Sequence, residues 1–479
     1  MKLKKAKIAI IGGGVAGATT ALYLGHLGLN VTLFEKELSL VGGPPFCHLH
    51  AGGNLYREIS DEQCIKLLKQ SIAFLQFYPF VVDYRPTVIV LPLTDSGTPD
   101  KLFPRLELLK KEYQNLIEQD INNKVLGESD NYYSLYSKEQ IEQLQKREFV
   151  DQPKSADDWM IPVAKNIDLE KVQFPLIMVQ EYGLNLFRLS AGVSIALEEL
   201  ATVTLKMGTI VHNIQKNVLD ERWELSSIYN DITDKESFDY LINATGFRTG
   251  KIDDMLGVPC KRMVEFKSAY VSKWNSSSKI LFPEIIFHGE RGTPQGMGQF
   301  TPYPNGYFQL HGMTNKITLY KDGLVENSLV SCQPHLNQNF IEKIDKSWKE
   351  DEVKERTNNA IEHLSAFIPA FTQAVVGSKP LFGAQQIPGD DPTLRVAEVS
   401  FPREKYARCE VVKVSSVLDM VENIAKELTA LGYLNNHLFG TENPFNLIAE
   451  EQIKEHAELI AKDRDYPESL ANRSVSKNS

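Results

Sequence analysis

Residues 7–36 read KIAIIGGGVAGATTALYLGHLGLNVTLFEK. The apolar run Lys7–Ile11 is typical of a buried parallel strand, and the glycine-rich stretch Gly12–Gly17 is typical of a tight turn. Ala16–Leu27 is rich in Ala and Leu and predicts a helix, and the apolar run Val31–Phe34 predicts a second buried strand. This stretch therefore predicts a βαβ unit at the start of an α/β fold.

The glycines of the turn have the GxGxxG spacing of a dinucleotide-binding loop. Gly12 permits the tight turn out of the strand, Gly14 lets the backbone approach a pyrophosphate, and Gly17 lets the helix pack closely on the strands. The first helical turn, at Val15 and Ala16, offers free N–H groups and a partial positive charge to the phosphates. The loop alone does not separate FAD from NAD(P).

An acidic residue follows at the place that such a loop requires. Glu35 ends the second strand, and dinucleotide folds carry a carboxylate there, about 20 residues after the glycines, that binds the ribose hydroxyls. Lys36 is the next residue along the same edge. A strand before the loop, a helix after it and this carboxylate together predict a nucleotide cofactor.

The bulk composition excludes several classes of protein. A chain of 479 residues holds two or three domains, and its net charge of −10 disfavours a nucleic-acid partner. The five cysteines contain no CxxC pair, so no metal site or redox dithiol is expected. No apolar run reaches the roughly 18 residues of a membrane span.

The basic start Met1–Lys5, followed by an apolar run, resembles a secretory signal. The glycine spacing and the strand that follows explain the same residues better, and wide spacing of free thiols fits a reducing compartment. We therefore expect a cytoplasmic protein, with peripheral contact with the inner membrane left open.

Helical patterns are expected at several places after the first unit, namely at 62–77, 102–119, 138–145, 190–200, 340–348, 355–367 and 411–431. Strands are expected at 87–92, 203–206, 209–214, 223–229, 240–244, 265–271, 284–288 and 307–312. Residues 154–175 are expected to be rich in loops, and the charged tail after about Asn446 is expected to fray at its last residues.

Three segments together resemble the D-amino-acid-oxidase-like (DAO) superfamily of FAD-dependent oxidoreductases. In the first, the strand ending on Glu35 and Lys36 is followed by the pair Gly42 and Gly43. The second is Thr209–Ile214, where Val211 matches the residue whose backbone meets the adenine. The third is an apolar strand that ends in a small-residue turn at the cofactor, with Ala244, Thr245 and Gly246 at its end.

The stretch His48–Tyr56 resembles, within this superfamily, the His-Ala-Gly stretch of L-2-hydroxyglutarate oxidases and dehydrogenases. The resemblance implies that His50 and Ala51 lie close to the flavin ring. The resemblance to these enzymes fades after about residue 260. They carry a glycine-bearing turn before their last helix, and the corresponding stretch here, Val411–Met420, lacks it.

A flavin enzyme of this kind needs a proton acceptor and a clamp for the substrate carboxylate. His50 is the candidate base, because imidazole titrates near working pH. Arginines are natural carboxylate clamps, and Arg57 is the first candidate. Further candidates are Arg85, Arg248 and Arg408 as clamps, Tyr56 and Tyr84 as hydrogen-bond donors, His48 as a flavin contact, and His311, which is expected to be structural.

The predicted fold is α/β, with a Rossmann-like discontinuous FAD-binding domain and a substrate domain that has a mixed or antiparallel sheet. The FAD-binding domain is expected at 1–60, 180–260 and 376–435, the substrate domain at 61–179 and 261–375, and a C-terminal extension at 436–479.

The predicted activity is oxidation of a small organic acid, with a 2-hydroxy acid favoured, by hydride transfer to the flavin. The expected electron acceptor is one such as oxygen or a quinone. Three alternatives stay open: an amine or amino-acid oxidase of the same fold, an NAD(P)-dependent dehydrogenase, and a redox-inactive FAD-binding protein.

Overall fold

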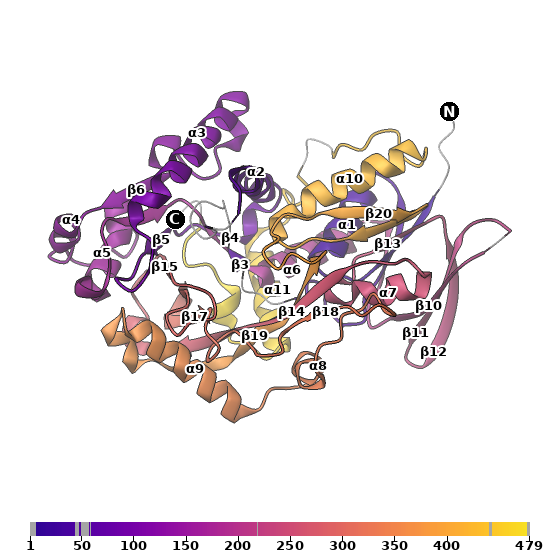
Figure 1. The fold of residues 1–479 in the computed structure, drawn as a ribbon. Coiled ribbons are helices and arrows are strands. Elements are labelled where there is room, and N and C mark those ends of the chain that lie inside the picture. Colours follow the sequence, from indigo (N-terminus) through magenta and orange to yellow (C-terminus); the bar gives the residue numbers. More distant parts are fainter. Residues whose placement is uncertain are drawn as a thin grey trace.

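The computed structural model describes residues 6–43, 57, 59–217, 219–439 and 443–476, and the backbone of residues 47–48. The molecule is elongated and is built around two large β-sheets that follow each other along its length (Figure 1). The first sheet carries the glycine loop, and the second supplies a polar face.

The first sheet has six strands in the order β20-β21-β13-β1-β2-β9. These strands are β1 (Lys7–Ile11), β2 (Asn30–Phe34), β9 (Val203–Lys206), β13 (Tyr240–Asn243), β20 (Val399–Arg403) and β21 (Tyr406–Cys409). All neighbours from β21 to β9 pair in parallel, and the edge strand β20 runs antiparallel. Segments far apart in the chain thus form one sheet, and the α/β prediction is confirmed.

Both faces of this sheet are covered. On one face, α1 (Val15–His26) packs against α10 (Val417–Ala430) and α6 (Leu186–Glu198). The other face is covered by α7 (Thr249–Leu256) and an antiparallel sheet of β10 (Ile210–Lys216), β11 (Trp223–Tyr229) and β12 (Ile232–Phe238). The parallel strands are therefore buried on both sides, as their continuous apolar runs predicted.

The second sheet has nine strands, in the order β18-β14-β17-β16-β15-β5-β7-β6 with β19 paired to β14. These strands are β5 (Thr87–Val90), β6 (Tyr133–Tyr136), β7 (Leu176–Val179), β14 (Arg262–Lys273), β15 (Glu284–Phe287), β16 (Gly298–Tyr303), β17 (Tyr307–Gly312), β18 (Leu324–Glu326) and β19 (Val375–Pro388). The pairs are antiparallel except β5–β15, so this sheet is mixed.

The two faces of the second sheet differ. One face is apolar and packs on α5 (Ala156–Asn166) and α9 (Glu350–Ser365), with side chains such as Phe300 and Phe308 fully buried. On the opposite face the same strands carry polar side chains that are also buried, such as Gln299 and Gln309. Apolar and polar residues thus alternate with the period of two that a strand imposes.

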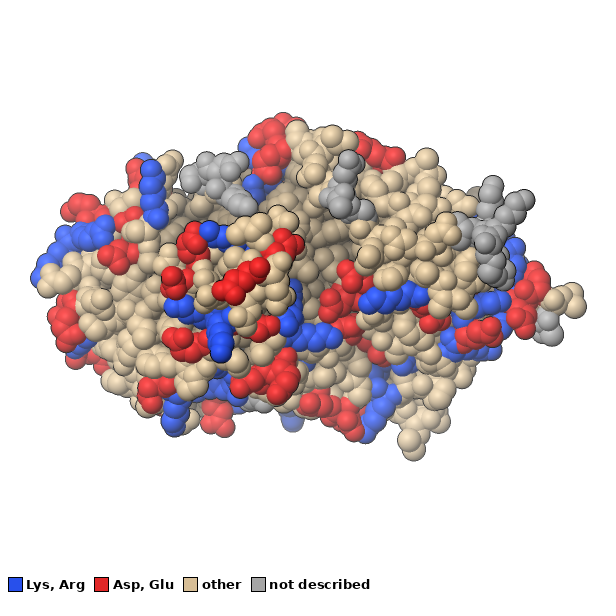
Figure 2. All heavy atoms as spheres, turned by 90° about the horizontal axis from the view of Figure 1, so that it is seen from above, with Lys and Arg blue, Asp and Glu red and all other residues tan. Residues whose placement is uncertain are grey.

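The remaining elements connect and cover these sheets. They are α2 (Asp61–Phe77), α3 (Phe103–Gln119), α4 (Lys138–Leu144), α8 (Gln338–Asp345), α11 (Glu450–Asp463) and a small antiparallel sheet of β3 (Cys47–His48), β8 (Gly183–Leu184) and β4 (Val82–Asp83). The C-terminal helix α11 packs against α6. On the face seen in Figure 2, the described basic side chains lie next to acidic ones and do not form one basic stripe.

One expectation about local structure is wrong: the stretch 154–175 contains α5, whose start is capped by Ser155 and Asp158. The segment 411–431 ends with a helix as expected, and this helix, α10, begins at Val417 after a 3-10 turn at Val414–Ser416. The charged tail forms α11, a helix that was not predicted from the sequence, and the last residues, 477–479, lie outside the described part of the chain. Within the described residues, no helix is both long and apolar enough to cross a membrane.

Candidate functional site

The glycine loop connects β1 to α1 and lies against the end of β13. Gly12 has a φ of +99°, and a Cβ there would lie 2.6 Å from the Ala244 carbonyl oxygen. A Cβ on Gly17 would lie only 1.8 Å from the carbonyl oxygen of Gly12. These two glycines are therefore required by the packing of the protein itself.

Gly14 differs, because among the described residues, its chain neighbours and the backbone of α1 aside, a Cβ there would meet no atom within 4 Å. Gly14 is the N-cap of α1, so the first-turn amides of Val15 and Ala16 follow it directly. A side chain at Gly14 would project into the open space in front of these amides. Open space at a helix N-terminus is what a diphosphate needs, and the residues present therefore fit the dinucleotide that the sequence predicts.

The carboxylate of Glu35 joins the end of β2 to this loop. Its Oε2 accepts a hydrogen bond from the Gly13 N–H at 2.5 Å, and its Oε1 accepts one from the Glu37 N–H at 2.8 Å. Lys36 forms ion pairs with Glu37 and, at 3.5 Å, with Asp345 of α8. The acidic residue of the motif thus lies beside the glycines, where the parallel pairing of β1 and β2 places it.

The other predicted cofactor residues converge on the same edge of the first sheet. The Thr209 N–H donates to the Glu35 carbonyl at 2.8 Å, which brings Val211 of β10 near the end of β2. The Val41 N–H donates to the Gly13 carbonyl at 2.9 Å, which brings Gly42 and Gly43 to the glycine loop.

Ala244, Thr245 and Gly246 follow β13, which is the parallel neighbour of β1. Gly246 has a φ of +59°, in the left-handed region that glycine tolerates best. All described residues that the sequence assigns to the cofactor therefore lie around one edge. The assigned residues His50 and Ala51 lie outside the described residues.

Arg464, from the end of α11, holds the segment that leads to Gly42. Its guanidinium donates to the Leu40 carbonyl at 2.7 Å, to the Val41 carbonyl at 3.1 Å and to Ser39 Oγ at 2.9 Å. Val41 itself has a φ of +53°, unusual for a β-branched residue. The C-terminal extension thus fixes a strained segment that contacts the glycine loop. Sequence reasoning missed this residue, because nothing in its local sequence marks it.

The polar face of the second sheet is centred on β16 and β17. Gln299 lies directly opposite His311, and Thr301 lies opposite Gln309. The Gln299 amide donates to Glu284 Oε1 at 2.8 Å and to Thr301 Oγ1 at 3.2 Å. Buried polar groups of this density are costly unless they are paired, and a sheet that keeps them on one face is typical of a binding surface.

This polar face is linked to the first sheet through β19. Gln385 of β19 lies opposite Glu265 of β14, on the same face. Its amide donates at 2.8 Å to the carbonyl of Val412, in the segment just before α10. The neighbouring residue Gln386 accepts a hydrogen bond from Thr249 Oγ1 of α7 at 3.1 Å. The polar face therefore lies next to elements of the nucleotide-binding sheet.

Arg57 lies at the margin of the polar face. One of its nitrogens donates to Asp95 Oδ1 at 2.8 Å, and another donates to Nδ1 of His288, the residue that follows β15. Because a guanidinium can only donate, Nδ1 is the acceptor in this contact. Burial raises the pKa of Asp95, but the Arg57 guanidinium and the Gly97 N–H outweigh it and hold the pKa below its usual value.

His311 is a buried histidine with local partners. Its Nδ1 lies 3.2 Å from Thr318 Oγ1, and its ring also hydrogen-bonds the backbone of Ser268. Burial and the nearby Lys267 lower the pKa of His311 to about 3. The ring is therefore neutral at physiological pH and both bonds hold it in place, as a structural histidine requires.

A carboxylate on the same face is paired with two cations. Glu265 forms ion pairs with Arg291 and, at 3.3 Å, with Lys267. Burial raises the pKa of Glu265, but the two cations outweigh burial and the pKa is lowered. The carboxylate is therefore ionised and neutralised by its partners.

Two of the candidate clamps have another role. Arg85 is buried between Asp83 at 3.2 Å and Glu284 at 3.0 Å. Arg408 is bound to Asp253 at 3.3 Å and to Glu410 at 2.9 Å. Because each guanidinium is neutralised by two carboxylates, the structure disfavours Arg85 and Arg408 as clamps for a substrate carboxylate.

The other candidates are placed as follows. Arg248 binds Asp345 through both carboxylate oxygens, at 2.7 and 2.9 Å. Tyr84 packs against Tyr182 with ring centroids 5.2 Å apart. His48 pairs with Gly183 through its backbone in β3, and Tyr56 lies outside the described residues. Of the candidate clamps, Arg57 borders the polar face through His288, and Arg85 lies beneath it, bound to Glu284.

The comparisons with known proteins agree with this geometry. A family model described as FAD dependent oxidoreductase (DAO) matches residues 7–152. A search of curated protein sequences found no match.

Several solved structures have a fold similar to that of this chain over most of the length of both chains. L-proline dehydrogenase from P. horikoshii has a TM-score of 0.56 at 15% identity, covering 89% of this chain and 95% of that chain. L-alpha-glycerophosphate oxidase from Mycoplasma pneumoniae has a TM-score of 0.57 at 15% identity, covering 92% and 98%. Glycine oxidase from Geobacillus kaustophilus has a TM-score of 0.56 at 12% identity, covering 89% and 95%. At these identities the likeness shows the fold.

The matched family model indicates FAD and an oxidoreductase, the glycine loop fits a dinucleotide, and the similar structures show the fold. The alternatives of an NAD(P)-dependent dehydrogenase and of a redox-inactive protein are therefore set aside. The chain is an FAD-dependent oxidoreductase with the DAO fold.

Proposed function

We propose that this enzyme oxidises a small organic acid, with a 2-hydroxy acid favoured, at the carbon that carries the hydroxyl group. The C–H bond breaks with its electron pair, the hydroxyl proton leaves, and a carbonyl group forms. FAD, when bound, accepts the hydride, which is the step that the protein cannot perform itself. The chain then has to hold the acid, orient it and accept the proton.

The observation that carries this proposal is the way Asp95 and His288 hold the guanidinium of Arg57. Its contacts to Asp95 and His288 use two of the five N–H donors of a guanidinium and fix the plane of the group at the margin of the polar face. A fixed guanidinium is a two-point donor for a carboxylate, which a flexible ammonium is not. We assign Arg57 the substrate carboxylate on this ground.

The proton acceptor in this proposal is His50, on the resemblance to L-2-hydroxyglutarate oxidases and dehydrogenases. His311 is unsuited to the role, because its low pKa of about 3 and its two partners make it a poor acceptor. His288 is unsuited at Nδ1, because that nitrogen already accepts a bond from Arg57. Neither described histidine of the polar face is therefore suited to accept the proton, which supports the choice of His50 on another segment.

A spectral titration under anaerobic conditions tests the activity. The purified yellow protein is mixed with a panel of acids, and bleaching of the flavin absorbance reports reduction. We expect bleaching by at least one 2-hydroxy acid and none by the corresponding acid without the hydroxyl group. Failure of every 2-hydroxy acid in a broad panel would refute the proposal.

Oxidation of an amine or amino acid is the second candidate. It is favoured by similar solved structures such as L-proline dehydrogenase and glycine oxidase. Pairs of acids that share a skeleton and differ only in a hydroxyl or an amino group at the second carbon separate the two. Faster bleaching by the amino member of each pair would replace the first candidate with the second.

The electron acceptor in this proposal is oxygen or a quinone. The reduced protein can be exposed to each acceptor separately, and recovery of the yellow colour measured. Rapid recovery in air would identify an oxidase, whereas recovery only with a quinone would identify a dehydrogenase and support contact with a membrane surface.

A further inference from the structure

Residues 39–41, which follow β2, lie against the middle of the glycine loop. The Val41 N–H donates to the Gly13 carbonyl at 2.9 Å, and a Cβ on Gly13 would lie 2.7 Å from Leu40 Cδ2. Leu40 and Val41 are both buried. A shift of this segment would therefore change the surroundings of Gly13 and the shape of the loop.

The segment is strained, and a distant arginine holds it. Val41 has a φ of +53°, in the left-handed region that a β-branched residue rarely adopts, and such a conformation persists only where surrounding contacts enforce it. All three nitrogens of the Arg464 guanidinium donate to the segment. Nε and Nη2 donate to Ser39 Oγ, Nη2 also donates to the Leu40 carbonyl, and Nη1 donates to the Val41 carbonyl. These contacts come from 423 residues further along the chain.

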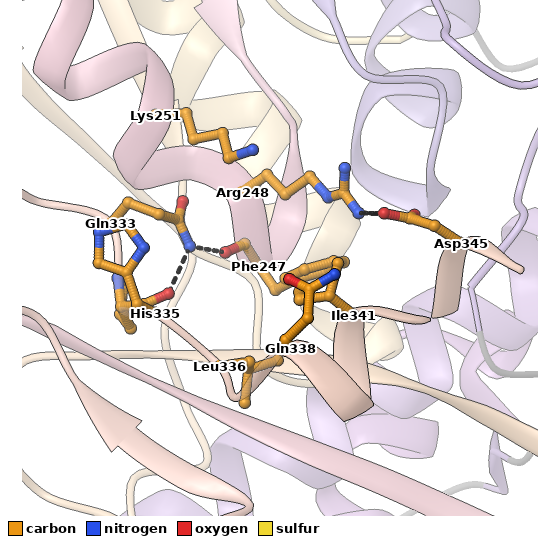
Figure 3. A pocket seen from close by; sticks show the side chains of 10 residues that line it. Phe247, Arg248, Lys251, Gln333, His335, Leu336, Gln338, Ile341 and Asp345 are labelled. Carbon is orange, nitrogen blue, oxygen red and sulfur yellow. Dashed lines mark hydrogen bonds and ion pairs between the residues drawn. The ribbon is translucent and has the colours of Figure 1, made fainter. Parts of the chain in front are cut away.

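The other end of the same segment is held less firmly. Lys36 forms an ion pair with Asp345 of α8 at 3.5 Å, and both side chains are partly exposed. Asp345 is in turn bound by Arg248 (Figure 3). Exposed ion pairs of this kind contribute little to stability, so the firmer hold on the segment is that of Arg464.

Arg464 directly follows α11, and the docking of this helix places it. The helix packs against α6, beside which it lies in Figure 1. Two residues later, the Tyr466 hydroxyl donates to the Pro380 carbonyl of β19 at 2.8 Å, and its ring centroid lies 5.7 Å from that of Phe187 in α6. The contacts of Arg464 with residues 39–41 therefore depend on the docking of α11.

The guanidinium also lies near the acidic residue of the glycine motif. Burial lowers the pKa of Arg464, and Tyr466, Glu37 and Glu35 oppose this effect only in part. Oε2 of Glu35 accepts the hydrogen bond from the Gly13 N–H at 2.5 Å. The positive charge of Arg464 is therefore placed beside the carboxylate that fixes the loop from its other side.

We propose that Arg464 is a positioning residue for FAD, and that the docking of α11 and the binding of FAD are coupled through it. Arg464 keeps residues 39–41 against Gly13, so that the glycine loop keeps the shape into which a diphosphate fits. Such coupling is reciprocal, so bound FAD stabilises the docked α11 by the same factor by which the docked helix strengthens FAD binding. This role concerns the cofactor and does not depend on which substrate the enzyme oxidises.

The first test is the rate at which the holoenzyme releases FAD after dilution, with free FAD separated by ultrafiltration and measured by its absorbance. We expect Arg464→Met to release FAD at least about tenfold faster than the wild type, because it loses several hydrogen bonds made by a charged group. Arg464→Lys should fall between the two, since one ammonium replaces only part of a three-nitrogen contact. Release at the wild-type rate from Arg464→Met would overturn the proposal.

The matched control is Arg356→Met. Arg356 is another half-buried arginine that donates to a backbone carbonyl, that of Ile317 at 2.6 Å, but it lies in α9 on the second sheet. Its loss should lower the thermal stability and leave the release of FAD unchanged. Release that is accelerated equally in Arg356→Met and Arg464→Met would show a general loss of stability instead of a role for Arg464.

The second test needs no variant and therefore stands even if Arg464→Met does not fold. Hydrogen–deuterium exchange is measured in the wild-type holoenzyme and in the same chain after FAD has been removed by dialysis. We expect removal of FAD to speed exchange in α11 more than in α4, which packs against α5 of the second sheet. An equal change in the two helices would overturn the coupling.

The same measurement on Arg464→Lys assigns the coupling to this residue. Removal of FAD should then change exchange in α11 less than it does in the wild type, whereas the response of α1, which begins at the glycine loop, should be retained. A response of α11 that is as large as in the wild type would mean that another contact carries the coupling, and Arg464 would lose the role.

Discussion

The edge of the first sheet and the polar face of the second sheet are built in different ways. The edge is built from backbone: Gly12 and Gly17 are packed against carbonyl oxygens, and Gly14 leaves open space in front of helical amides. The polar face is built from side chains on separate strands, such as Gln299, His311 and Arg57. The structure of the first region is therefore set by a few glycines of one short motif. The structure of the second region is set by side-chain contacts between strands that lie far apart in the sequence.

The glycine loop gives the sharpest test of this difference. Gly14→Val should abolish FAD binding and activity but leave the apoprotein folded, because in the described part of the chain no atom other than those of its neighbours and of the α1 backbone lies within 4 Å of the added Cβ. Gly17→Ala should instead lose the folded protein, because its Cβ would lie 1.8 Å from the Gly12 carbonyl oxygen. Flavin absorbance and circular dichroism measure the two properties. Stoichiometric FAD in purified Gly14→Val would contradict the role of the loop.

The proposed base gives the next largest effect. His50→Asn should slow anaerobic reduction of the flavin by about a hundredfold or more, because general-base catalysis contributes that much. FAD content should stay unchanged, and stopped-flow mixing with the best acid of the panel measures the rate. A rate equal to that of the wild type would remove His50 from the mechanism.

The proposed clamp should affect binding more than chemistry. Arg57→Lys should weaken the apparent affinity for the acid by about tenfold, because a lysine cannot offer the two parallel donors of a guanidinium. The rate of flavin reduction at saturating acid should change much less. Titrations at several acid concentrations separate the two quantities.

The matched control for Arg57 is Arg147→Lys, at an exposed ion pair remote from the polar face. It should leave both affinity and rate unchanged. An Arg57→Lys variant that loses rate at saturation but not affinity would show that Arg57 acts through another residue.

The smallest effect on activity is expected for His311, whose role concerns stability. The pKa of His311 is about 3 in the folded protein against 6.5 in the unfolded chain, so below pH 6.5 the unfolded state binds one proton more. Its contribution to stability is therefore present above pH 6.5 and is lost as the pH falls toward 3, by about 1.4 kcal/mol per pH unit. His311→Gln should reduce the slope of the free energy of unfolding in this range. Urea denaturation at several pH values measures it, and an unchanged slope would show that the ring is not buried as a neutral group.

The nucleotide-binding edge could be predicted because its signals are local. The GxGxxG spacing, the helix and Glu35 fall within one short segment, and parallel pairing then fixes their neighbours. The resemblance to a known family added Val211 and the turn at Gly246, which the structure brings to the same edge.

The polar face could not be predicted in this way, because its contacts join segments far apart. Arg57, Asp95 and His288 meet only because β5 and β15 pair in parallel, with the His288 N–H donating to the Val90 carbonyl at 2.8 Å. The strands around them show alternating polar residues, but alternation does not say which strand lies next to which.

Two helices were missed although their signals were present. Ser155 and Asp158 form the capping box of α5, but Pro162 within the helix and the polar residues before it favoured a loop. In α11 the buried residues Ile453, Ala457 and Ile460 follow helical spacing, but the surrounding charges hid the pattern. Weighing caps and spacing above composition would have found both.

The bonds from Arg464 to the carbonyls of Leu40 and Val41 have a consequence for biosynthesis. The glycine loop leaves the ribosome well before Arg464, which is translated more than four hundred residues later. A nascent chain therefore carries the nucleotide-binding loop long before the segment beside that loop is fixed. We therefore expect tight capture of the cofactor to wait until Arg464 has been made, and chains that end before it to retain flavin poorly.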